Sequence, residues 1–361
     1  MNQPPTKTNA SRITELDALR GLAALSVTLY HFLNLYGKVF GRTRPLAIDF
    51  AWGTHGVWLF FMLSGYVIFM TLERCRGFLD FMIGRFSRLF PAYWAAALVT
   101  YMIVHFYGLP GQEVPVRDAL WNLSMLPRFA RADFIDHSYW SLEPELIFYA
   151  VMALVFVGGA LKRMRSVLAL WLLAAALAHG VLVFFPTDAF AYHVAGKIKA
   201  VLVLDYIHLF AIGMIFYDVR RSGRKWTPGH LALLAAALSM TFWVSPLTEA
   251  LCITALAALF YAATTNRLPV LSSRPLLWLG SISYSLYLTH QSLGIIALHW
   301  FDAHGWEPHL AVLIVTAASL GFAAVLSAMV EYPAMRWLRA RFRKQSPKTP
   351  PIASHAYGAT A

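Results

Sequence analysis

Apolar residues occur along the chain in long blocks that are separated by short polar or basic segments. A helix needs about 20 mainly apolar residues to cross a hydrocarbon core of about 30 Å. Ten blocks have roughly this length: residues 16–36, 52–72, 89–107, 142–161, 167–185, 201–219, 231–244, 247–263, 276–300 and 310–330. The seventh and eighth blocks meet at Ser245-Pro246 and form either a full or a shallow hairpin, and both alternatives return the chain to the same side. The pattern predicts an all-α integral membrane protein, a bundle of about ten transmembrane helices in one domain.

The first block carries two ionisable residues, Arg20 and His31, eleven positions apart. At about 100° and 1.5 Å per residue, this spacing puts both side chains on one helix face, roughly 16 Å apart along the axis. Because an unpaired charge in hydrocarbon costs several kcal/mol, such side chains normally face a bundle interior or a wet cavity. We therefore expect this helix to form a wall of a functional site.

The composition agrees with a membrane protein, since 58% of the residues are hydrophobic and 13% are charged. Of the 30 Lys and Arg residues, 21 fall on the side of the N-terminus, eight fall on the opposite side, and Arg20 lies inside the first helix. Because cytoplasmic loops retain Lys and Arg, both termini are predicted to be cytoplasmic. The net charge of +12 is spread over six cytoplasmic segments. This spread argues against nucleic-acid binding and favours contact with anionic membrane lipids.

Three segments follow from this topology. Residues 1–15 form a cytoplasmic N-terminal segment without a cleavage signature, and residues 16–339 form the membrane domain. Residues 340–361 form a tail rich in Pro, Ser and Thr that we expect to be disordered. The two cysteines, Cys75 and Cys252, have the spacing of neither a disulfide framework nor a metal site, so no metal and no permanently bound cofactor is expected.

The fourth block begins within the sequence WSLEPELIFY. Ser141 is a candidate N-cap, and Pro144 falls in the first turn, where its missing amide proton is harmless. Ser141, Glu145 and Tyr149 align at i, i+4 and i+8 and form a polar stripe that enters the membrane. Counted along their helices, Glu145 lies about 6 Å and His31 about 8 Å inside the outer membrane boundary. We therefore expect these two side chains to meet.

Two further motifs each allow a structural and a functional interpretation. Arg85 and Arg88 stand one turn apart at the cytoplasmic membrane edge, where they either anchor the topology or clamp a phosphate. In the second block, Ser64 and Gly65 form a small pair that either admits a closely packed helix or lines a substrate tunnel. The sequence does not decide between the structural and the functional interpretation for either pair.

Other polar residues also fall inside predicted helices. His290 lies about 20 Å into the ninth block, near the depth of His31, with Tyr287 one turn before it. It is either a hydrogen-bonded packing residue or a secondary site residue. Asp205 and His208, one turn apart in the sixth block, form either a satisfied pair or a contact to an acceptor.

Two acidic residues are expected to be structural. Asp17 precedes Arg20 by three positions and is expected to neutralise it. Glu331 precedes Tyr332-Pro333 and is expected to end the last helix at the inner membrane edge.

Six motifs, taken together, resemble those of one family of membrane enzymes. They are the Arg-to-His spacing in LDALRGLAALSVTLYHF, followed by FFMLSGYVI, RFSRLFPAYW, WSLEPELIFY, SISYSLYLTHQSL and VEYPAMR. In this order, over residues 16–339, the chain resembles the acyltransferase-3 family of membrane acyltransferases. It departs from the family at Glu143-Pro144, where small or aliphatic residues are common, so the entry of this helix is expected to differ locally.

The resemblance implies an enzyme that moves an acyl group, commonly acetyl from acetyl-CoA, onto a hydroxyl of an extracytoplasmic or lipid-linked glycan. Some relatives acylate small molecules such as macrolides. By position, Arg20 and His31 match the family's essential pair, and Glu145 matches the glutamate of its WSL-type motif. Arg85 and Arg88 match paired arginines proposed to hold the phosphate of coenzyme A.

The resemblance also implies partners and a location. Acyl-CoA, a glycan acceptor and membrane lipids are the expected partners, and the inner cell membrane is the expected location. Many relatives carry an appended extracytoplasmic hydrolase-like domain that this sequence lacks. The chain is therefore expected either to complete the transfer itself or to hand the acyl group to a separate extracytoplasmic transferase.

The mechanism and an alternative function stay open at this level. His31 can accept the proton of the attacking hydroxyl as a general base, with Glu145 assisting it, or can carry the acyl group itself. The alternative function is a proton-coupled transporter or a flippase of a glycolipid or small molecule. Such carriers often contain inverted repeats with broken helices, and the two halves of this sequence show no such similarity.

Overall fold

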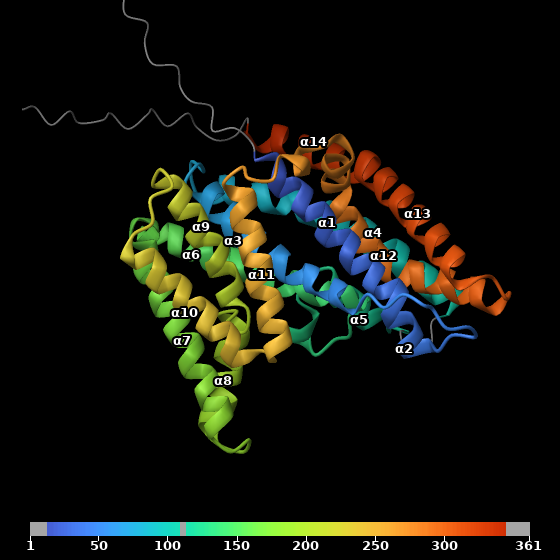
Figure 1. The fold of residues 1–361 in the computed structure, drawn as a ribbon, viewed down its shortest axis with the longest axis horizontal. Coiled ribbons are helices and arrows are strands. Elements are labelled where there is room, and N and C mark those ends of the chain that lie inside the picture. Colours follow the sequence, from blue (N-terminus) through green and yellow to red (C-terminus); the bar gives the residue numbers. More distant parts are fainter. Residues whose placement is uncertain (1–12, 109–112, 344–361) are drawn as a thin grey trace, which may run out of the picture.

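The computed structural model describes residues 13–108 and 113–343, and over these every regular element is helical (Figure 1). The α-helices are α1 (Thr14–Tyr30), α2 (Tyr36–Phe40), α3 (Gly56–Leu72), α4 (Phe78–Tyr107), α5 (Val116–Asn122), α6 (Leu142–Val157), α7 (Met164–Phe184), α8 (Phe190–Val201), α9 (Ile207–Arg221), α10 (Pro228–Val244), α11 (Leu247–Thr264), α12 (Arg274–Ala303), α13 (Pro308–Leu326) and α14 (Tyr332–Arg343). Short 3₁₀ turns are η2 (Ala51–His55), η3 (Pro127–Ala130), η4 (His137–Ser141), η5 (Ala160–Arg163) and η6 (Pro269–Ser272), and two π-helical turns are η1 (His31–Leu35) and η7 (Ser327–Glu331). The predicted all-α fold is confirmed for the described residues, and residues 1–12 and 344–361 of the predicted terminal segments lie outside them.

Within residues 13–108 and 113–343, six helical stretches are long and apolar enough to cross a membrane. They are Ala51–Leu72, Phe78–Tyr107, His137–Val157, Ala160–Phe184, Leu247–Thr264 and Pro308–Phe342, and α10 is a shorter apolar helix. The 30-residue helix α12 is long enough but is not among the six, since its polar side chains lower its mean hydropathy. The protein is therefore a multi-pass membrane protein, whereas the count of about ten spans and the cytoplasmic placement of the termini stay predictions.

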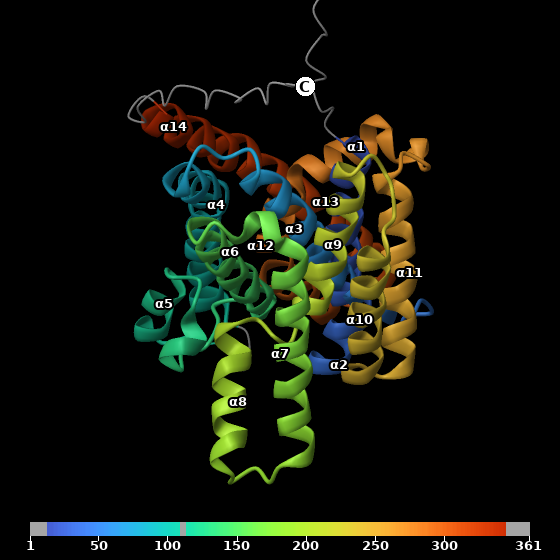
Figure 2. The same ribbon diagram turned by 90° about the vertical axis from the view of Figure 1, so that its left-hand side faces the viewer.

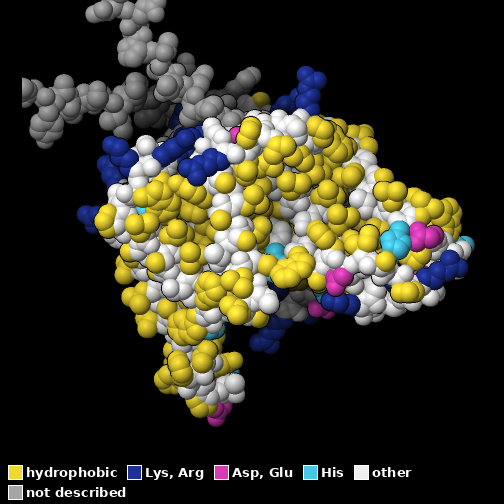
Figure 3. All heavy atoms as spheres, in the orientation of Figure 1, with side chains coloured by type: hydrophobic (Ala, Val, Ile, Leu, Met, Phe, Trp, Pro, Cys, Tyr) yellow, Lys and Arg dark blue, Asp and Glu magenta, His cyan; other side chains and the backbone are white. Residues whose placement is uncertain are grey.

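Large apolar side chains cover much of the molecular surface (Figure 3). Leu154 of α6 and Leu313 of α13, for example, are 69% and 66% exposed. Lys and Arg side chains gather along the upper edge of the same view, near the end of α9. Soluble monomers rarely expose contiguous apolar areas of this extent, so these surfaces fit contact with lipid.

α1 and α12 pack side by side (Figure 1). A Cβ on Gly21 would lie 2.5 Å from the backbone nitrogen of Gly280, and a Cβ on Gly280 would overlap the carbonyl group of Asp17. Farther along both helices, His31 meets His290, so the two helices run parallel. Small residues permit this close approach, which brings polar side chains of two helices together.

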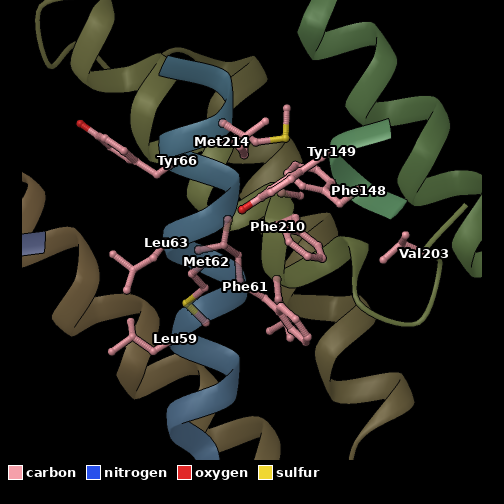
Figure 4. Close-up of a cluster of buried hydrophobic side chains, with 14 of the residues drawn as sticks. Leu59, Phe61, Met62, Leu63, Tyr66, Phe148, Tyr149, Val203, Phe210 and Met214 are labelled. Carbon is pink, nitrogen blue, oxygen red and sulfur yellow. The ribbon is translucent and has the colours of Figure 1, made fainter. Parts of the chain in front are cut away.

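α3 and α9 form a second close crossing. Gly65 of α3 lies against the backbone of Phe210, and Gly213 of α9 lies against the backbone of Met62, so a Cβ at either glycine would overlap its neighbour. Around this crossing, aromatic and aliphatic side chains of α3, α6 and α9 form a buried core (Figure 4). The packing interpretation of the small pair is confirmed for Gly65, whereas the adjacent Ser64 lines a cavity.

Two long helices contain a π-helical turn, and an ionisable residue lies in each turn. η1 begins at His31, and η7 ends at the buried Glu331. Turns of this kind occur frequently at functional sites. The expectation that Glu331 ends the last helix is wrong, because the wider turn accommodates the missing amide proton of Pro333. The helix continues to Arg343, four residues into the predicted tail.

Residues 116–141 connect α4 to α6, and the segment has exposed side chains such as Leu120 as well as buried ones. The almost fully buried Asp136 accepts a hydrogen bond from the backbone amide of Ser292 at 2.9 Å, and the hydroxyl of Tyr139 donates to the carbonyl of Leu288 at 2.9 Å. This segment therefore docks midway along α12. Because α6 follows it directly, α6 begins in the interior, deeper than the sequence indicated for the fourth block.

α7 and α8 form a hairpin that extends beyond the rest of the molecule (Figure 2). After α8 the chain turns at Val203, which has a φ of 55°, and α9 begins at Ile207. A residue in the left-handed conformation cannot continue a right-handed helix, so the helix is interrupted at Val203. The predicted sixth span, 201–219, is therefore a turn followed by a shorter helix.

Candidate active site

A cavity with about 70 Å³ of free space lies between α1, α3, α4, α6 and α12. Its polar wall residues are Arg20, Ser64, Arg85, Arg88, Ser141, Glu145, Tyr149, Tyr284 and Tyr287. All of these except Tyr284 are residues that the sequence analysis selected. The fold brings them together from segments far apart in the chain, and the tunnel-lining interpretation fits the position of Ser64.

Glu145 is the carboxylate in the wall of this cavity. It accepts hydrogen bonds from the hydroxyl groups of Ser64 and Tyr149. The bond to Tyr149 spans one helical turn, as the predicted polar stripe requires. Ser141, one turn earlier, instead lies 2.6 Å from the hydroxyl oxygen of Tyr287. The stripe on α6 thus contacts both α3 and α12.

Three guanidinium groups face the cavity. Arg20 lies 4.0 Å from Asp17, its predicted partner, and Arg88 lies 3.7 Å from the buried Glu331. The Nε of Arg85 is buried and finds no hydrogen-bond acceptor among the described residues. Guanidinium groups match the oxygens of carboxylates and phosphates. This part of the cavity therefore fits an anionic group.

His31 and His290 form a pair beside the cavity. Nδ1 of His31 lies 2.7 Å from Nε2 of His290, and the two rings are stacked with centroids 4.9 Å apart. The ring of His290 lies 5.7 Å from that of Tyr287, which lines the cavity. One side chain thus separates the histidine pair from the cavity.

The hydrogen-bond pattern assigns the tautomers of both histidines. Nδ1 of His290 faces the carbonyl oxygens of Tyr287 at 2.9 Å and Leu286 at 3.1 Å, so this nitrogen carries the proton. Nε2 of a neutral His290 then accepts, and Nδ1 of His31 donates to it. The remaining nitrogen of His31, Nε2, is left with a lone pair, which is the state a general base needs.

The expected contact between His31 and Glu145 is not the one that the structure forms. Glu145 binds side chains of α3 and α6, and His31 binds His290. The reason is that the two side chains lie at different levels along α12. Glu145 shares the cavity with Tyr284, which precedes His290 by six residues, or roughly 9 Å, along α12. The interior start of α6 moves Glu145 away from the level of the histidine pair.

Asp205 lies apart from the central cavity. It forms an ion pair with Lys199 at 2.6 Å and lines a separate pocket with Glu143. Its one-turn spacing to His208 brings no contact, because α9 begins only at Ile207. Nδ1 of the buried His208 has no hydrogen-bond partner within the described part of the chain. Of the two alternatives for Asp205 and His208, the satisfied pair is therefore not formed, and the contact to an acceptor stays a prediction.

The sequence analysis did not assign Tyr284 and Glu331 to the site. Tyr284 precedes Tyr287 by three positions and shares its helix face, a spacing that could have identified it. Its hydroxyl donates to the carbonyl of Leu89 at 3.0 Å. Glu331 reaches Arg88 because the last helix continues beside α4, and the local sequence contains no signal for this contact.

Comparison with known proteins identifies the family of this chain. A family model described as an acyltransferase domain matches residues 13–328. The chain belongs to the acyltransferase-3 family. This membership confirms the resemblance of the sequence motifs, and the protein is an acyltransferase. No solved structure is significantly similar to it.

Three relatives of this acyltransferase illustrate the family. Acyltransferase MdmB of Streptomyces mycarofaciens is 29% identical, with 91% of this chain and 93% of the relative covered. Nodulation protein 10 of Rhizobium leguminosarum bv. viciae is 25% identical, with 92% and 96% covered. YrhL of Bacillus subtilis, named as a peptidoglycan O-acetyltransferase, is 25% identical over 79% of this chain and 49% of its own length.

Proposed function

We propose that this acyltransferase moves an acyl group, with acetyl the expected one, from acyl-CoA at the cytoplasmic face to a hydroxyl of an extracytoplasmic or lipid-linked glycan. The family membership supports acyl transfer, and the name of YrhL supports acetyl as the group and a glycan as the acceptor class. The distribution of Lys and Arg supports a cytoplasmic donor, because it puts the start of α1 and the start of α4 on the cytoplasmic side.

The donor end of the proposed path is the part of the cavity around Arg20, Arg85 and Arg88. The buried Nε of Arg85 needs an acceptor, and a phosphate or thioester oxygen would supply one. Glu145 is held by two hydroxyl groups beside these cations. In this position it can orient polar groups of the donor or acceptor.

The histidine pair is the proposed site of proton transfer. The oxygen of the acceptor hydroxyl attacks the carbonyl carbon of the thioester, and Nε2 of His31 takes the hydroxyl proton. The carbon–sulfur bond then breaks, the ester forms, and the thiolate of the coenzyme takes up the proton from His31. General-base assistance of this kind contributes roughly 10²–10⁴ to the rate.

The hydrogen bond between His31 and His290 carries this proposal. Nδ1 of His290 donates to backbone carbonyls, which have no proton to give to the ring. Nε2 of His290 therefore accepts the proton on Nδ1 of His31, and this leaves Nε2 of His31 as the base. His290 takes the role that the sequence analysis gave to Glu145, and we propose it as the positioning residue of His31.

Profiling of acyl esters in a deletion strain tests the proposal. Surface polysaccharides, lipopolysaccharide and secreted metabolites would be analysed by mass spectrometry, and at least one ester should disappear. The wild-type gene and a His299→Ala variant should restore it, since His299 is exposed on the same helix. His31→Ala should not restore it.

Two results would contradict the proposal in different ways. Persistence of every ester in the deletion strain would refute acyl transfer to these acceptors. Full restoration by His31→Ala would refute the role of His31 while leaving the acceptor assignment intact.

A further inference from the structure

The pocket shared by Asp205 and Glu143 lies apart from the central cavity and has about 190 Å³ of free space. It is bounded by the start of α6, the end of α8 and the turn before α9. Figure 2 shows α8 in the hairpin at the bottom of the molecule and α14 at the top. Because the positive-inside distribution predicts that α14 is cytoplasmic, the pocket is predicted to lie toward the extracytoplasmic side. Its charged and aromatic wall residues are Arg128, Phe129, Glu143, Lys199, Asp205 and Tyr206.

Glu143 gives this pocket a buried hydrogen-bond acceptor that lacks a donor. The residue is only 6% exposed, and its Oε2 has no hydrogen-bond partner within residues 13–108 and 113–343. A buried polar atom of this kind costs free energy unless a ligand or water satisfies it. The pocket can therefore accept a hydrogen bond from a ligand.

The other charges of the pocket are balanced. Lys199 forms an ion pair with Asp205 at 2.6 Å, and Arg128 is the cation that interacts with Glu143. An anionic ligand would meet the two carboxylates, and a cationic ligand would meet the lysine and the arginine. Because like charges brought together disfavour binding, the wall favours an uncharged ligand that donates hydrogen bonds.

Two aromatic rings give the pocket an apolar side. Phe129 is 55% exposed, whereas Tyr206 is held by ring contacts to Trp58 and Trp140, with centroids 6.1 Å and 5.8 Å away. An aromatic face covers the C–H side of a sugar ring, and a carboxylate accepts the protons of its hydroxyl groups. Drug-sized ligands occupy roughly 300–1,000 Å³, so this smaller pocket fits one sugar unit.

The start of α6 separates this pocket from the central cavity. Glu145 lines the cavity, whereas Glu143 and Pro144 line the pocket. The ring of Tyr206 lies 5.1 Å from that of Phe61, which is a wall residue of the central cavity. A sugar unit bound in the pocket therefore leaves the central cavity free for the next unit of the same glycan.

We propose that the pocket binds an uncharged sugar unit of the acceptor, next to the unit whose hydroxyl is acylated. Oε2 of Glu143 accepts a hydrogen bond from a hydroxyl group of this sugar, and the ring of Tyr206 covers its apolar side. The ion pair of Lys199 and Asp205 keeps the pocket neutral. The inference rests on the proposed function, because it assumes a glycan acceptor, and it adds that two linked sugar units are recognised.

Glu143→Met tests this assignment, because methionine is also unbranched and removes the acceptor oxygen. The variant would be expressed in the deletion strain, and the amount of ester on the acceptor would be measured by mass spectrometry. We expect the amount of ester to fall about tenfold or more, since a hydrogen bond to a charged acceptor is lost. Glu143→Gln keeps a carbonyl oxygen and should retain an intermediate amount.

Two controls separate ligand binding from a structural role of Glu143. Purified Glu143→Met should unfold at the temperature of the wild type or above it, because Oε2 has no partner in the described part of the folded protein. Asp188→Ala is the matched variant, since Asp188 is an exposed carboxylate between α7 and α8 that does not line the pocket. It should keep the full amount of ester.

The identity of the neighbouring sugar gives a second, independent test. Tandem mass spectrometry of the acylated glycan would identify the unit that is linked to the acylated one, and this unit should be uncharged. A uronic acid or a free amino sugar at that place would overturn the pocket. An ester on a molecule with a single sugar unit or none would overturn it as well.

The remaining outcomes distinguish the two proposals. A full amount of ester in Glu143→Met would overturn the pocket and leave acyl transfer standing. A lower unfolding temperature together with less ester would give Glu143 a structural role and would also overturn the pocket. Persistence of every ester in the deletion strain would overturn the proposed function, on which the pocket depends.

Discussion

The side chain of His31 lies at the first residue of a π-helical turn, where its ring meets His290 of a parallel helix. The protons of this pair are assigned by the carbonyls of Leu286 and Tyr287, which accept from the far nitrogen of His290. Which nitrogen of His31 carries the proton therefore depends on the backbone of another helix. This dependence leads to a direct prediction for His290.

Replacing His290 with Phe removes the acceptor of the His31 Nδ1 proton but keeps an aromatic ring. We expect the rate of ester formation in membranes supplied with acetyl-CoA to fall by up to roughly 10²-fold, within the range of general-base effects. The KM for acetyl-CoA should stay unchanged, and the pH profile should shift because the His31 ring loses the hydrogen bond from its Nδ1. His299→Phe serves as the control. An unchanged rate and pH profile in His290→Phe would refute the positioning role.

A second prediction at this scale concerns the start of α13. Glu307 caps this helix, because its carboxylate accepts hydrogen bonds from the ring of His309 at 2.6 Å and from the backbone amide of Leu310 at 2.7 Å. These bonds lower the pKa of Glu307 to about 2. The unperturbed pKa is about 4.3, so the cap stabilises the fold above that pH and its contribution is lost as the pH falls toward 2. Glu307→Ala should lower the melting temperature at pH 7.

The pH dependence provides the check on this prediction. Thermal unfolding in detergent should show the largest difference between the wild type and Glu307→Ala above pH 5, and a smaller difference at pH 3. Glu249→Ala, at the first turn of α11, is the control, because no side-chain hydrogen bond caps the start of that helix. A difference that is constant from pH 3 to pH 7 would contradict the assignment.

At the scale of elements, the site depends on how closely α1 and α12 approach. Gly21 and Gly280 remove the side chains that would hold these helices apart. The same parallel pair then carries Arg20 to the central cavity and joins His31 to His290. Two contacts of different kinds, one steric and one polar, thus depend on a single helix crossing.

Gly21→Ala tests this coupling. The added Cβ would meet the backbone of Gly280, which cannot move aside as a flexible side chain would, so we expect a destabilisation of about 1–3 kcal/mol and a loss of acyl transfer. Thermal unfolding and ester yield would be measured together. Gly321→Ala in α13 is the control, because its Cβ would enter open space. Equal stability of the two variants would contradict the crossing.

At the scale of the whole molecule, the exposed apolar surface and the ends of α12 define how the protein sits in a membrane. The 30 residues of α12 span about 45 Å, enough to reach from one face to the other. Ser273 and Ala303, at its two ends, are both exposed. The positive-inside distribution predicts that Ser273 faces the cytoplasm and Ala303 the opposite side.

Single cysteines at these two positions test the topology. In a background with Cys75→Ala and Cys252→Ala, a membrane-impermeant maleimide added to intact cells should label Ala303→Cys and not Ser273→Cys. Both should react after permeabilisation. Labelling of Ser273→Cys in intact cells would reverse the predicted orientation and with it the cytoplasmic donor.

Some features were predictable because they depend on local sequence alone. The apolar blocks predict helices, and the spacing of Glu145 and Tyr149 predicts their hydrogen bond one turn apart. The packing role of Gly65 and the proximity of Asp17 to Arg20 follow from neighbouring residues in the same way. Each is a consequence of helix geometry, which needs no knowledge of the partners.

Other predictions were wrong because they depend on how far along the helix bundle a side chain lies. That position is a property of the folded chain. The position of Glu145 was counted from the membrane surface, but Asp136 and Tyr139 bind midway along α12 and set the start of α6 there. Asp205 likewise lies in the turn that follows Val203, before α9 begins at Ile207, so its spacing to His208 is not one helical turn. In both cases a local count assumed a straight helix that begins at the membrane boundary.

The sequence by itself determined that this chain is a helical membrane protein of the acyltransferase-3 family and which polar residues enter its helices. Composition and hydrophobic periodicity depend only on the order of the residues, so they can be analysed without knowing which residues are in contact. The tertiary structure decided which of those residues meet: Glu145 with Ser64 and Tyr149, and His31 with His290. Pairing across helices is set by close crossings and by the docking of an internal segment, and no local pattern records these distances.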